Sequence, residues 1–168
     1  MAFSYIDIFA GAGGLSEGFQ RNGYIPVAHV EMKKEACFTL KTRECFYYLK
    51  KHGRIEDYKN YLRKEITRDE LYAMVPEEVL DSVINETMSE EGMPALFDRI
   101  DHLMEMQGIE NVDVLVGGPP CQAYLGLSAY TIFIRRLMNK DDAGTAILMR
   151  YTLRLLTAQQ YERAASMI

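Results

Sequence analysis

The residues best suited to covalent chemistry in this sequence surround Cys121. Residues 117–122 read Gly-Gly-Pro-Pro-Cys-Gln and follow an apolar run, 112–116, that predicts a buried strand. Two prolines stiffen the loop and fix the direction of the next side chain. A cysteine in the core needs no such lead-in, whereas Cys37 and Cys45 lie in helical stretches and are expected to be ordinary buried residues. The pattern indicates that Cys121 is presented to a ligand at the end of a strand.

A glycine-rich turn near the N-terminus is the second candidate site. Residues 5–9 predict a short buried strand, residues 10–14 read Ala-Gly-Ala-Gly-Gly, and a helix is expected at or just after Leu15. Glycines let a ligand approach the backbone, and a helix start offers free N–H groups. Ser16 occupies the third glycine slot of a dinucleotide fingerprint, so a nucleoside without phosphate, such as S-adenosylmethionine, fits better than a pyrophosphate. The alternative is an ordinary strand-to-helix turn.

Glu31 ends a second apolar strand, 25–30, and is the third candidate. In doubly wound folds an acid at this place binds the ribose hydroxyls of a nucleoside. An isolated glutamate would more often be a helix N-cap or a surface acid, but the glycine turn one strand earlier favours the ribose role. The three histidines have no ligand spacing, so we expect no metal site.

The elements that must position these residues are predicted in the order strand, loop, helix, strand and helix from the N-terminus. This order is typical of a parallel α/β sheet. Residues 43–108 are longer than a plain crossover requires and mostly helical in pattern. We interpret them as an inserted helical segment beside the sheet. The stretch ending in Asn85 fits either a strand or a helix, so its role as an adenine contact stays open.

Composition limits the class of protein. The chain has 168 residues with 48% hydrophobic and 26% charged residues, which suits one globular domain with a real core. No apolar run reaches the ~18–20 residues of a membrane span, and the N-terminus lacks the basic start of a secretory signal. Three scattered cysteines do not make a disulfide framework. We therefore expect a cytoplasmic protein without membrane contact.

Charge changes along the chain. The net charge is −5, but residues 1–124 carry −8 and residues 125–168 carry +3. An acidic chain is not an obvious nucleic-acid binder when it is taken as a whole. The change in character near residue 125 indicates that the two parts differ.

The order and spacing of these blocks resemble the DNA (cytosine-5)-methyltransferase family. The resemblance covers about residues 3–124 and rests on 7–14 with Gly18-Phe19, on Glu31, and on the highly specific 117–122. Enzymes that methylate exocyclic amino groups carry Asn or Asp before Pro-Pro and an aromatic residue after it, whereas Gly118 and Cys121 stand here. The resemblance implies a Rossmann-like class I S-adenosylmethionine-dependent methyltransferase fold, here incomplete and with the helical insertion, that methylates carbon 5 of cytosine.

The resemblance also implies roles for single residues. Cys121 would be the nucleophile that adds to carbon 6 of cytosine, and Pro120 would shape its pocket. The implied S-adenosylmethionine-binding residues are Phe9, Ala10, Gly11, Gly13, Gly14, Glu31 and Met32. Double-stranded DNA would be the partner, with the target base flipped out of the stack. A bacterial restriction-modification system is a common setting for such enzymes.

The sequence departs from the family after Tyr124. A serine and a mobile loop should follow, and later a Glu-Asn-Val block, an Arg-x-Arg block and a target-recognition domain, but none is found. We therefore interpret residues 1–124 as the N-terminal part of a catalytic domain and 125–168 as an atypical tail of a truncated or frameshifted chain. Loss of the acid that protonates cytosine N3 would cost ~10²–10³ in rate. DNA binding is expected to be weak or absent.

Two other classes of function stay open. The chain could be an S-adenosylmethionine-binding module without catalysis, in which case it binds the nucleoside but does not trap a cytosine analogue. It could also be a nicotinamide-dependent oxidoreductase with a reactive cysteine. The missing third glycine and the Pro-Pro-Cys-Gln block argue against that second alternative.

Overall fold

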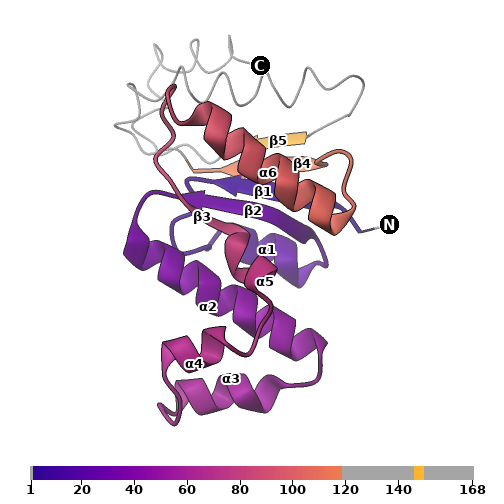
Figure 1. Ribbon diagram of the computed structural model, residues 1–168. Coiled ribbons are helices and arrows are strands. Elements are labelled where there is room, and N and C mark those ends of the chain that lie inside the picture. The colour runs from indigo at the N-terminus through magenta and orange to yellow at the C-terminus, as the bar shows by residue number, and fades with distance from the viewer. Residues whose placement is uncertain (1, 119–145, 150–168) are drawn as a thin grey trace, which may run out of the picture.

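The computed structural model describes residues 2–118 and the backbone of residues 146–149, and a parallel sheet lies at its centre (Figure 1). The strands stand in the order β3-β2-β1-β4-β5, and each pair of neighbours is parallel. Their carboxyl ends therefore meet at one edge of the sheet. Their bounds are β1 (Ser4–Ile8), β2 (Ile25–Glu31), β3 (Val83–Asn85), β4 (Val114–Gly117) and β5 (Ala146–Met149). The predicted α/β class is confirmed.

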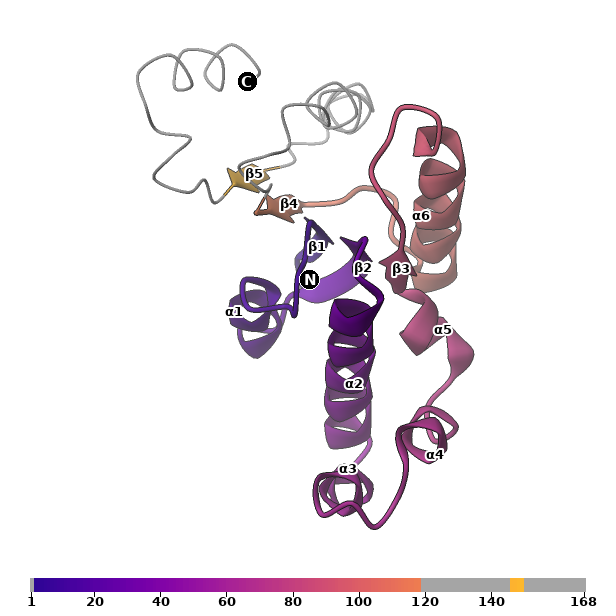
Figure 2. The same ribbon diagram turned by 90° about the vertical axis from the view of Figure 1, so that its left-hand side faces the viewer.

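Helices cover both faces of the sheet, which is why β1 is buried along its whole length. Figure 2 shows α1 (Ser16–Arg21) and α2 (Lys34–Lys51) on one face and α6 (Met93–Gln107) on the other. Helix α6 has Pro94 in its first turn and ends at Gly108, which has a left-handed φ of 66°. Its apolar side chains share one core cluster with the sheet: Leu96, Phe97, Ile100, Leu103 and Met104.

The segment 43–108 differs in part from the predicted helical insertion. It contains β3, which belongs to the sheet, and α6, which is the crossover helix to β4. The additional helices are α3 (Ile55–Leu62), α4 (Arg68–Tyr72) and α5 (Glu77–Asp81). A separate apolar cluster with Cys45, Leu49, Leu71 and Val75 at its centre holds the second half of α2 against this extension. The stretch that ends in Asn85 fitted either a strand or a helix, because three residues show no usable periodicity, and the structure shows that it is the strand β3.

The predicted tail, 125–168, contributes a strand to the sheet. Backbone residues Ala146–Met149 pair with β4 in parallel, with Gly117 opposite Met149. Pairing in register with β4 means that at least this part of the segment is integrated into the fold. The sequence change near residue 125 therefore does not mark the end of the sheet.

Gly117 at the end of β4 allows close packing against β1. A β-carbon there would lie 2.9 Å from Cγ1 and 3.1 Å from the carbonyl oxygen of Ile8. We expect Gly117→Ala to lower the free energy of unfolding by about 1–3 kcal/mol, because the backbone of β1 must shift. Gly118→Ala is the matched control, since no atom of the described residues lies within 4 Å of its β-carbon position. Urea unfolding measures both, and equal stability of the two variants would contradict the packing argument.

Candidate functional site

The glycine-rich loop after β1 has an unusual backbone. Gly11 and Gly13 have φ values of 57° and 81°, and Phe9, which is not glycine, has a φ of 56°. Side chains other than glycine rarely adopt this region, so the conformation must be held in place by its surroundings. The N–H of Ala10 donates to the Val30 carbonyl, and that of Gly13 donates to the Ala10 carbonyl. The loop is thus tied to β2 and closed on itself.

Glu31 fixes the other side of this loop. Its carboxylate is buried and accepts a hydrogen bond from the Gly11 N–H at 2.8 Å through Oε2. Oε1 accepts a second bond at 2.8 Å from the N–H of Lys33, at the start of α2. Charge-assisted bonds of this kind are strong, so the carboxylate holds a definite orientation at the carboxyl end of β2. Glu31 therefore organises the loop as well as being available to a ligand.

The neighbours of Glu31 leave room for a nucleoside. Within residues 2–118, no atom lies within 4 Å of the β-carbon positions of Gly11 and Gly14, so these residues leave the backbone of the loop uncovered there. Met32 beside it is 59% exposed, an unusual state for a large apolar side chain. Asn85 pairs with Glu31 in the sheet and donates its side-chain amide to the carbonyls of Glu31 and Met32 at 2.9 Å. A polar anchor beside an exposed apolar side chain and an open backbone matches the donor set that a ribose and a base require.

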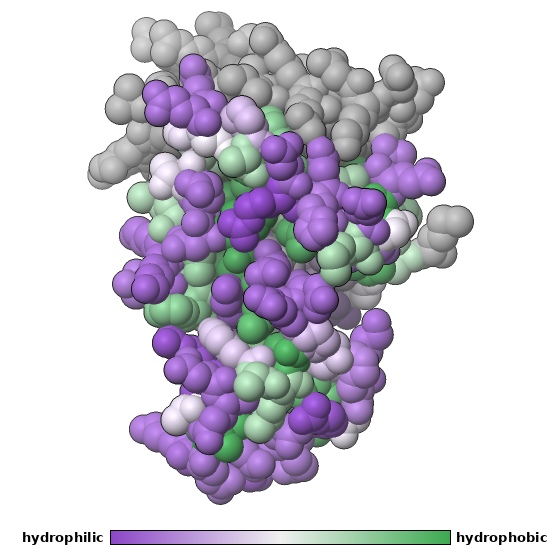
Figure 3. Space-filling model, viewed as in Figure 1, coloured by the Kyte–Doolittle hydropathy of each residue, from purple (hydrophilic) through white to green (hydrophobic). Residues whose placement is uncertain are grey.

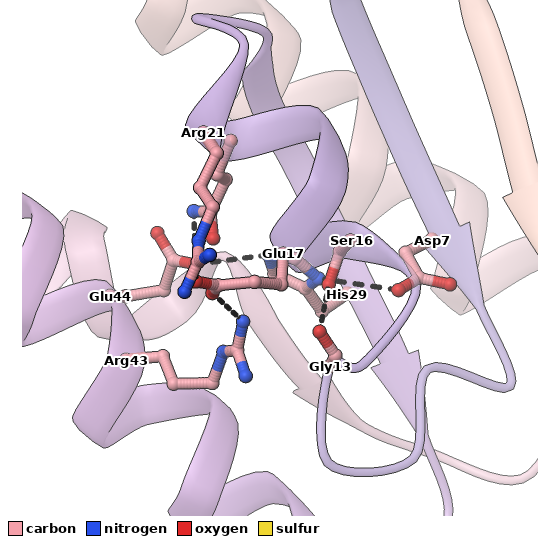
Figure 4. Close-up of polar contacts among 9 residues, drawn as sticks. Asp7, Gly13, Ser16, Glu17, Arg21, His29, Arg43 and Glu44 are labelled. Carbon is pink, nitrogen blue, oxygen red and sulfur yellow. Dashed lines mark hydrogen bonds and ion pairs between the residues drawn. The ribbon is translucent and has the colours of Figure 1, made fainter.

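A second layer of contacts supports the loop from α1 and α2. Ser16 is buried and donates to the Gly13 carbonyl at 3.2 Å. Glu17 pairs with Arg43 of α2 and with Arg21, as Figure 4 shows. A β-carbon on Gly13 would lie 2.8 Å from Leu40 of α2, so the loop and this helix are in close contact there. The start of α1 is thereby fixed relative to α2.

A buried polar group lies beneath the loop in the same view (Figure 4). His29 of β2 is fully buried, with its Nε2 3.1 Å from the Glu44 carboxylate and its Nδ1 4.0 Å from that of Asp7. Gln20 of α1 donates to the same Glu44 oxygen at 2.6 Å. Burial alone would lower the pKa of His29, but the two carboxylates raise it to about 9. The two carboxylates therefore favour the protonated form of His29.

This raised pKa predicts how stability depends on pH. The folded pKa of about 9 lies above the ordinary value of 6.5, so the stabilisation is complete below 6.5 and is lost as pH rises through 9. We expect the free energy of unfolding to fall over this range, with a slope of at most ~1.4 kcal/mol per pH unit from this one proton. Urea titrations from pH 6 to 9 on the wild type and on His29→Gln measure the effect. An equally steep fall in the variant would contradict the assignment.

The structure brings most of the predicted site residues to one edge of the sheet. Ile8 lies opposite both Val30 and Gly117, so the loop after β1, the end of β2 and the end of β4 are neighbours. Cys121 and Pro120 lie outside the described residues, three and two positions beyond Gly118. The chain that leads to them leaves β4 at the same edge as the glycine loop.

The other two cysteines behave as predicted. Cys37 and Cys45 are 3% and 0% exposed. Burial raises the pKa of the Cys37 thiol, and it raises that of Cys45 to about 12. Neither is a thiolate at neutral pH, and a thiolate is the form that attacks an electrophile.

Some parts of the site were missed by sequence reasoning. The Gly11 N–H bond to Glu31 has no signature in the sequence, because only the folded loop brings the two together. Asn85 was a candidate for the adenine contact, but the stretch that ends in it fits either a strand or a helix, so the sequence did not decide its role. The Asp7, His29 and Glu44 group joins three elements, and a charged residue within each apolar pattern is the one signal that could have indicated it.

Comparison with known proteins gives a consistent result. Residues 3–76 match the family described as C-5 cytosine-specific DNA methylase. The type II methyltransferase M.Bpa9945I of Bacillus paralicheniformis is 35% identical over 156 residues, covering 83% of this chain and 34% of that protein. The putative type II methyltransferase M.MjaORF1200P of Methanocaldococcus jannaschii is 30% identical over 169 residues, covering 86% of this chain and 42% of that protein. No solved structure matches the chain.

The extent of these matches bears on the predicted tail. The chain spans about a third to two fifths of the length of these two relatives. Residues 1–124 make up roughly three quarters of the chain, so matches over 83% and 86% reach beyond residue 124. The similarity therefore extends further along the chain than the motifs do.

Proposed function

We propose a DNA-modifying function on the premise that residues 3–76 of this chain belong to the C-5 cytosine-specific DNA methylase family. The protein of which this sequence is all or part transfers the methyl group of S-adenosylmethionine to carbon 5 of cytosine in double-stranded DNA. The named relatives are type II methyltransferases, which supports a modification enzyme of a restriction-modification system as the setting.

One observation carries the proposal. The carboxylate of Glu31 is held by two backbone N–H groups at the carboxyl end of β2, directly beside the open backbone of Gly11. A nucleoside bound there meets a fixed anion for its ribose hydroxyls. No phosphate cradle is needed for such a ligand, which agrees with Ser16 in the third glycine slot.

Each of several described residues has its own role in binding S-adenosylmethionine. Phe9 and Ala10 begin the loop. Three glycines, Gly11, Gly13 and Gly14, give the loop its shape. Glu31 orients the ribose, and the exposed side chain of Met32 packs against the base. The side-chain NH₂ of Asn85 donates to the carbonyls of Glu31 and Met32, and its side-chain carbonyl oxygen would accept a hydrogen bond from the adenine amino group.

The chemistry at cytosine belongs to Cys121. Bound S-adenosylmethionine supplies an electrophilic methyl group. The Cys121 thiolate forms a bond to carbon 6, which moves electron density to carbon 5 and makes that carbon nucleophilic. After carbon 5 is methylated, it loses its proton to a base, and elimination breaks the carbon–sulfur bond and restores the thiolate. Pro120 fixes the direction of the sulfur.

Methyl transfer with product analysis tests this function. Excess protein is incubated with duplex DNA and tritiated S-adenosylmethionine, so that slow turnover remains measurable. We expect the label in 5-methylcytosine, together with calorimetric binding of S-adenosylmethionine and no binding of NADH. Label in N4-methylcytosine or N6-methyladenine would refute the assignment of carbon 5. Binding of the nucleoside without any transfer would favour a binding module.

A further inference from the structure

Positive charge is concentrated in one stretch of this acidic chain. Residues 33–64, which contain α2 and α3, hold ten Lys and Arg against four Asp and Glu, a net charge of +6. The rest of the chain therefore carries −11, since the total is −5. In Figure 3 the lower part of the molecule carries hydrophilic side chains with apolar ones between them. A separation of charge of this size attracts a polyanion to one region and repels it from the remainder.

The start of α2 brings part of this charge to the edge where the candidate site lies. Lys33 and Lys34 follow Met32 directly, are exposed, and form no ion pair with the described residues. The Lys34 ammonium lies 5.8 Å from the centre of the Phe38 ring. The Arg68 guanidinium of α4 lies 3.8 Å from the centre of the same ring. Two cations from separate helices thus meet at one aromatic side chain.

The Arg68 guanidinium is ordered by an aromatic ring and has no close carboxylate partner among the described residues. Its stacking on Phe38 orders the guanidinium, and its Nε is buried without a hydrogen-bond partner among the described residues. The nearest acid is Asp69, whose oxygen lies 3.9 Å away and whose side chain is 91% exposed. A pair at this distance in water contributes little, so it is readily exchanged for a phosphate. Two other acids lie at this end of α2: Glu35 is exposed, and the carboxylate of Glu31 is buried and accepts the backbone N–H groups of Gly11 and Lys33.

We infer that Lys34 and Arg68, with Lys33 beside them, form an edge patch that binds the phosphate backbone of duplex DNA. This inference rests on the proposed function, because DNA whose cytosine reaches the site must pass its backbone along the same edge. Figure 1 places the starts of α2 and α4 on the side where the strands end. The contact is independent of DNA sequence, since lysine and arginine here meet phosphates and not base edges.

The opposite end of α2 supplies a matched control. Lys50 is also exposed, and its ammonium lies 5.7 Å from the centre of the Phe46 ring, just as Lys34 lies over Phe38. The sixteen positions between the two lysines correspond to ~24 Å along the helix. That distance exceeds the Debye length of ~10 Å at 0.1 M salt, so a charge at Lys50 does not act on a phosphate bound at Lys34. Lys34→Glu and Lys50→Glu change the net charge equally.

Fluorescence anisotropy with a short DNA duplex, from ~50 to ~200 mM salt, measures the difference. We expect Lys34→Glu to weaken binding several-fold and to reduce the slope of log K against log salt by about 1, because one phosphate contact is lost. Lys50→Glu should change neither by a comparable amount. Equal effects of the two variants, no effect of either, or no salt-dependent binding by the wild type would each overturn the edge patch.

Two further measurements separate this inference from the proposed function. Thermal melting checks that both variants are folded, and calorimetry checks that the wild type binds S-adenosylmethionine. A wild type that binds the nucleoside and methylates cytosine, while the two variants bind DNA alike, overturns only the edge patch. A wild type that does not bind the nucleoside overturns the proposed function, whatever the lysine variants do.

Discussion

Replacing Cys121 with serine is expected to abolish methyl transfer to cytosine. A hydroxyl is not ionised at neutral pH and is a far weaker nucleophile than a thiolate, so carbon 5 is never activated. We expect the rate of transfer to fall by at least ~10³-fold, since removal of a catalytic nucleophile typically costs this much or more. Single-turnover assays with tritiated S-adenosylmethionine measure the loss.

The controls for this variant separate chemistry from folding. Cys121→Ser should bind S-adenosylmethionine with unchanged affinity, because the cysteine attacks the base and does not hold the nucleoside. Cys45→Ala is the matched cysteine variant and should retain transfer, since Cys45 is buried among the added helices and burial raises its pKa to about 12. Transfer that persists in Cys121→Ser and disappears in Cys45→Ala would reverse the assignment of the nucleophile.

Glu31→Gln is expected to weaken the binding of S-adenosylmethionine roughly 10- to 100-fold. The present carboxylate accepts one N–H on each oxygen, from Gly11 and from Lys33. An amide can accept only one of them, because its NH₂ group would face the other donor. Hydrogen bonds to a charged group contribute about 1.5–3 kcal/mol each, and the ribose loses such a partner at the same time. Isothermal titration calorimetry gives the dissociation constant directly.

Glu35→Gln controls for the loss of one negative charge at this end of the sheet. Glu35 lies in the first turn of α2 and is exposed, so its neutralisation should change the dissociation constant by less than about twofold. Circular dichroism checks that Glu31→Gln is folded. If both glutamate variants bind the nucleoside as tightly as the wild type, Glu31 only supports the loop and the ribose lies elsewhere.

Much of the fold could be predicted because the decisive signals are local. The stretches that became β1, β2 and β4 are short and mostly apolar, as is typical of strands buried on both faces, and a glycine-rich or charged segment follows each of them. Gly108 and Pro94 mark the ends of α6 for steric reasons that hold in any context. Strand β3 lacks such a local signal, since three residues carry too little pattern to separate a strand from a helix. Its place beside β2 is set by tertiary pairing.

The site was predictable in its residue types but not in its bonding. Glycines at positions 11 and 13 indicated a turn that a ligand can approach closely, and in the structure both residues have a positive φ. The same conformation at Phe9 could not be foreseen, because nothing in a phenylalanine favours it and the loop closure imposes it. The dual role of Glu31 likewise depends on a 2.8 Å approach between residues twenty positions apart. The raised pKa of His29 depends on two carboxylates that come from different elements.

Covalent capture of a cytosine analogue tests the central claim most directly. Duplex DNA that contains 5-fluorocytosine is incubated with the protein and S-adenosylmethionine, and the complex is digested for peptide mass spectrometry. Fluorine cannot leave carbon 5 as a proton does, so the elimination that frees the sulfur is blocked. We predict an adduct on the peptide that contains Cys121, formed only when the methyl donor is present. An adduct on Cys37 or Cys45, or no adduct from protein that demonstrably binds both the nucleoside and the DNA, would contradict the account.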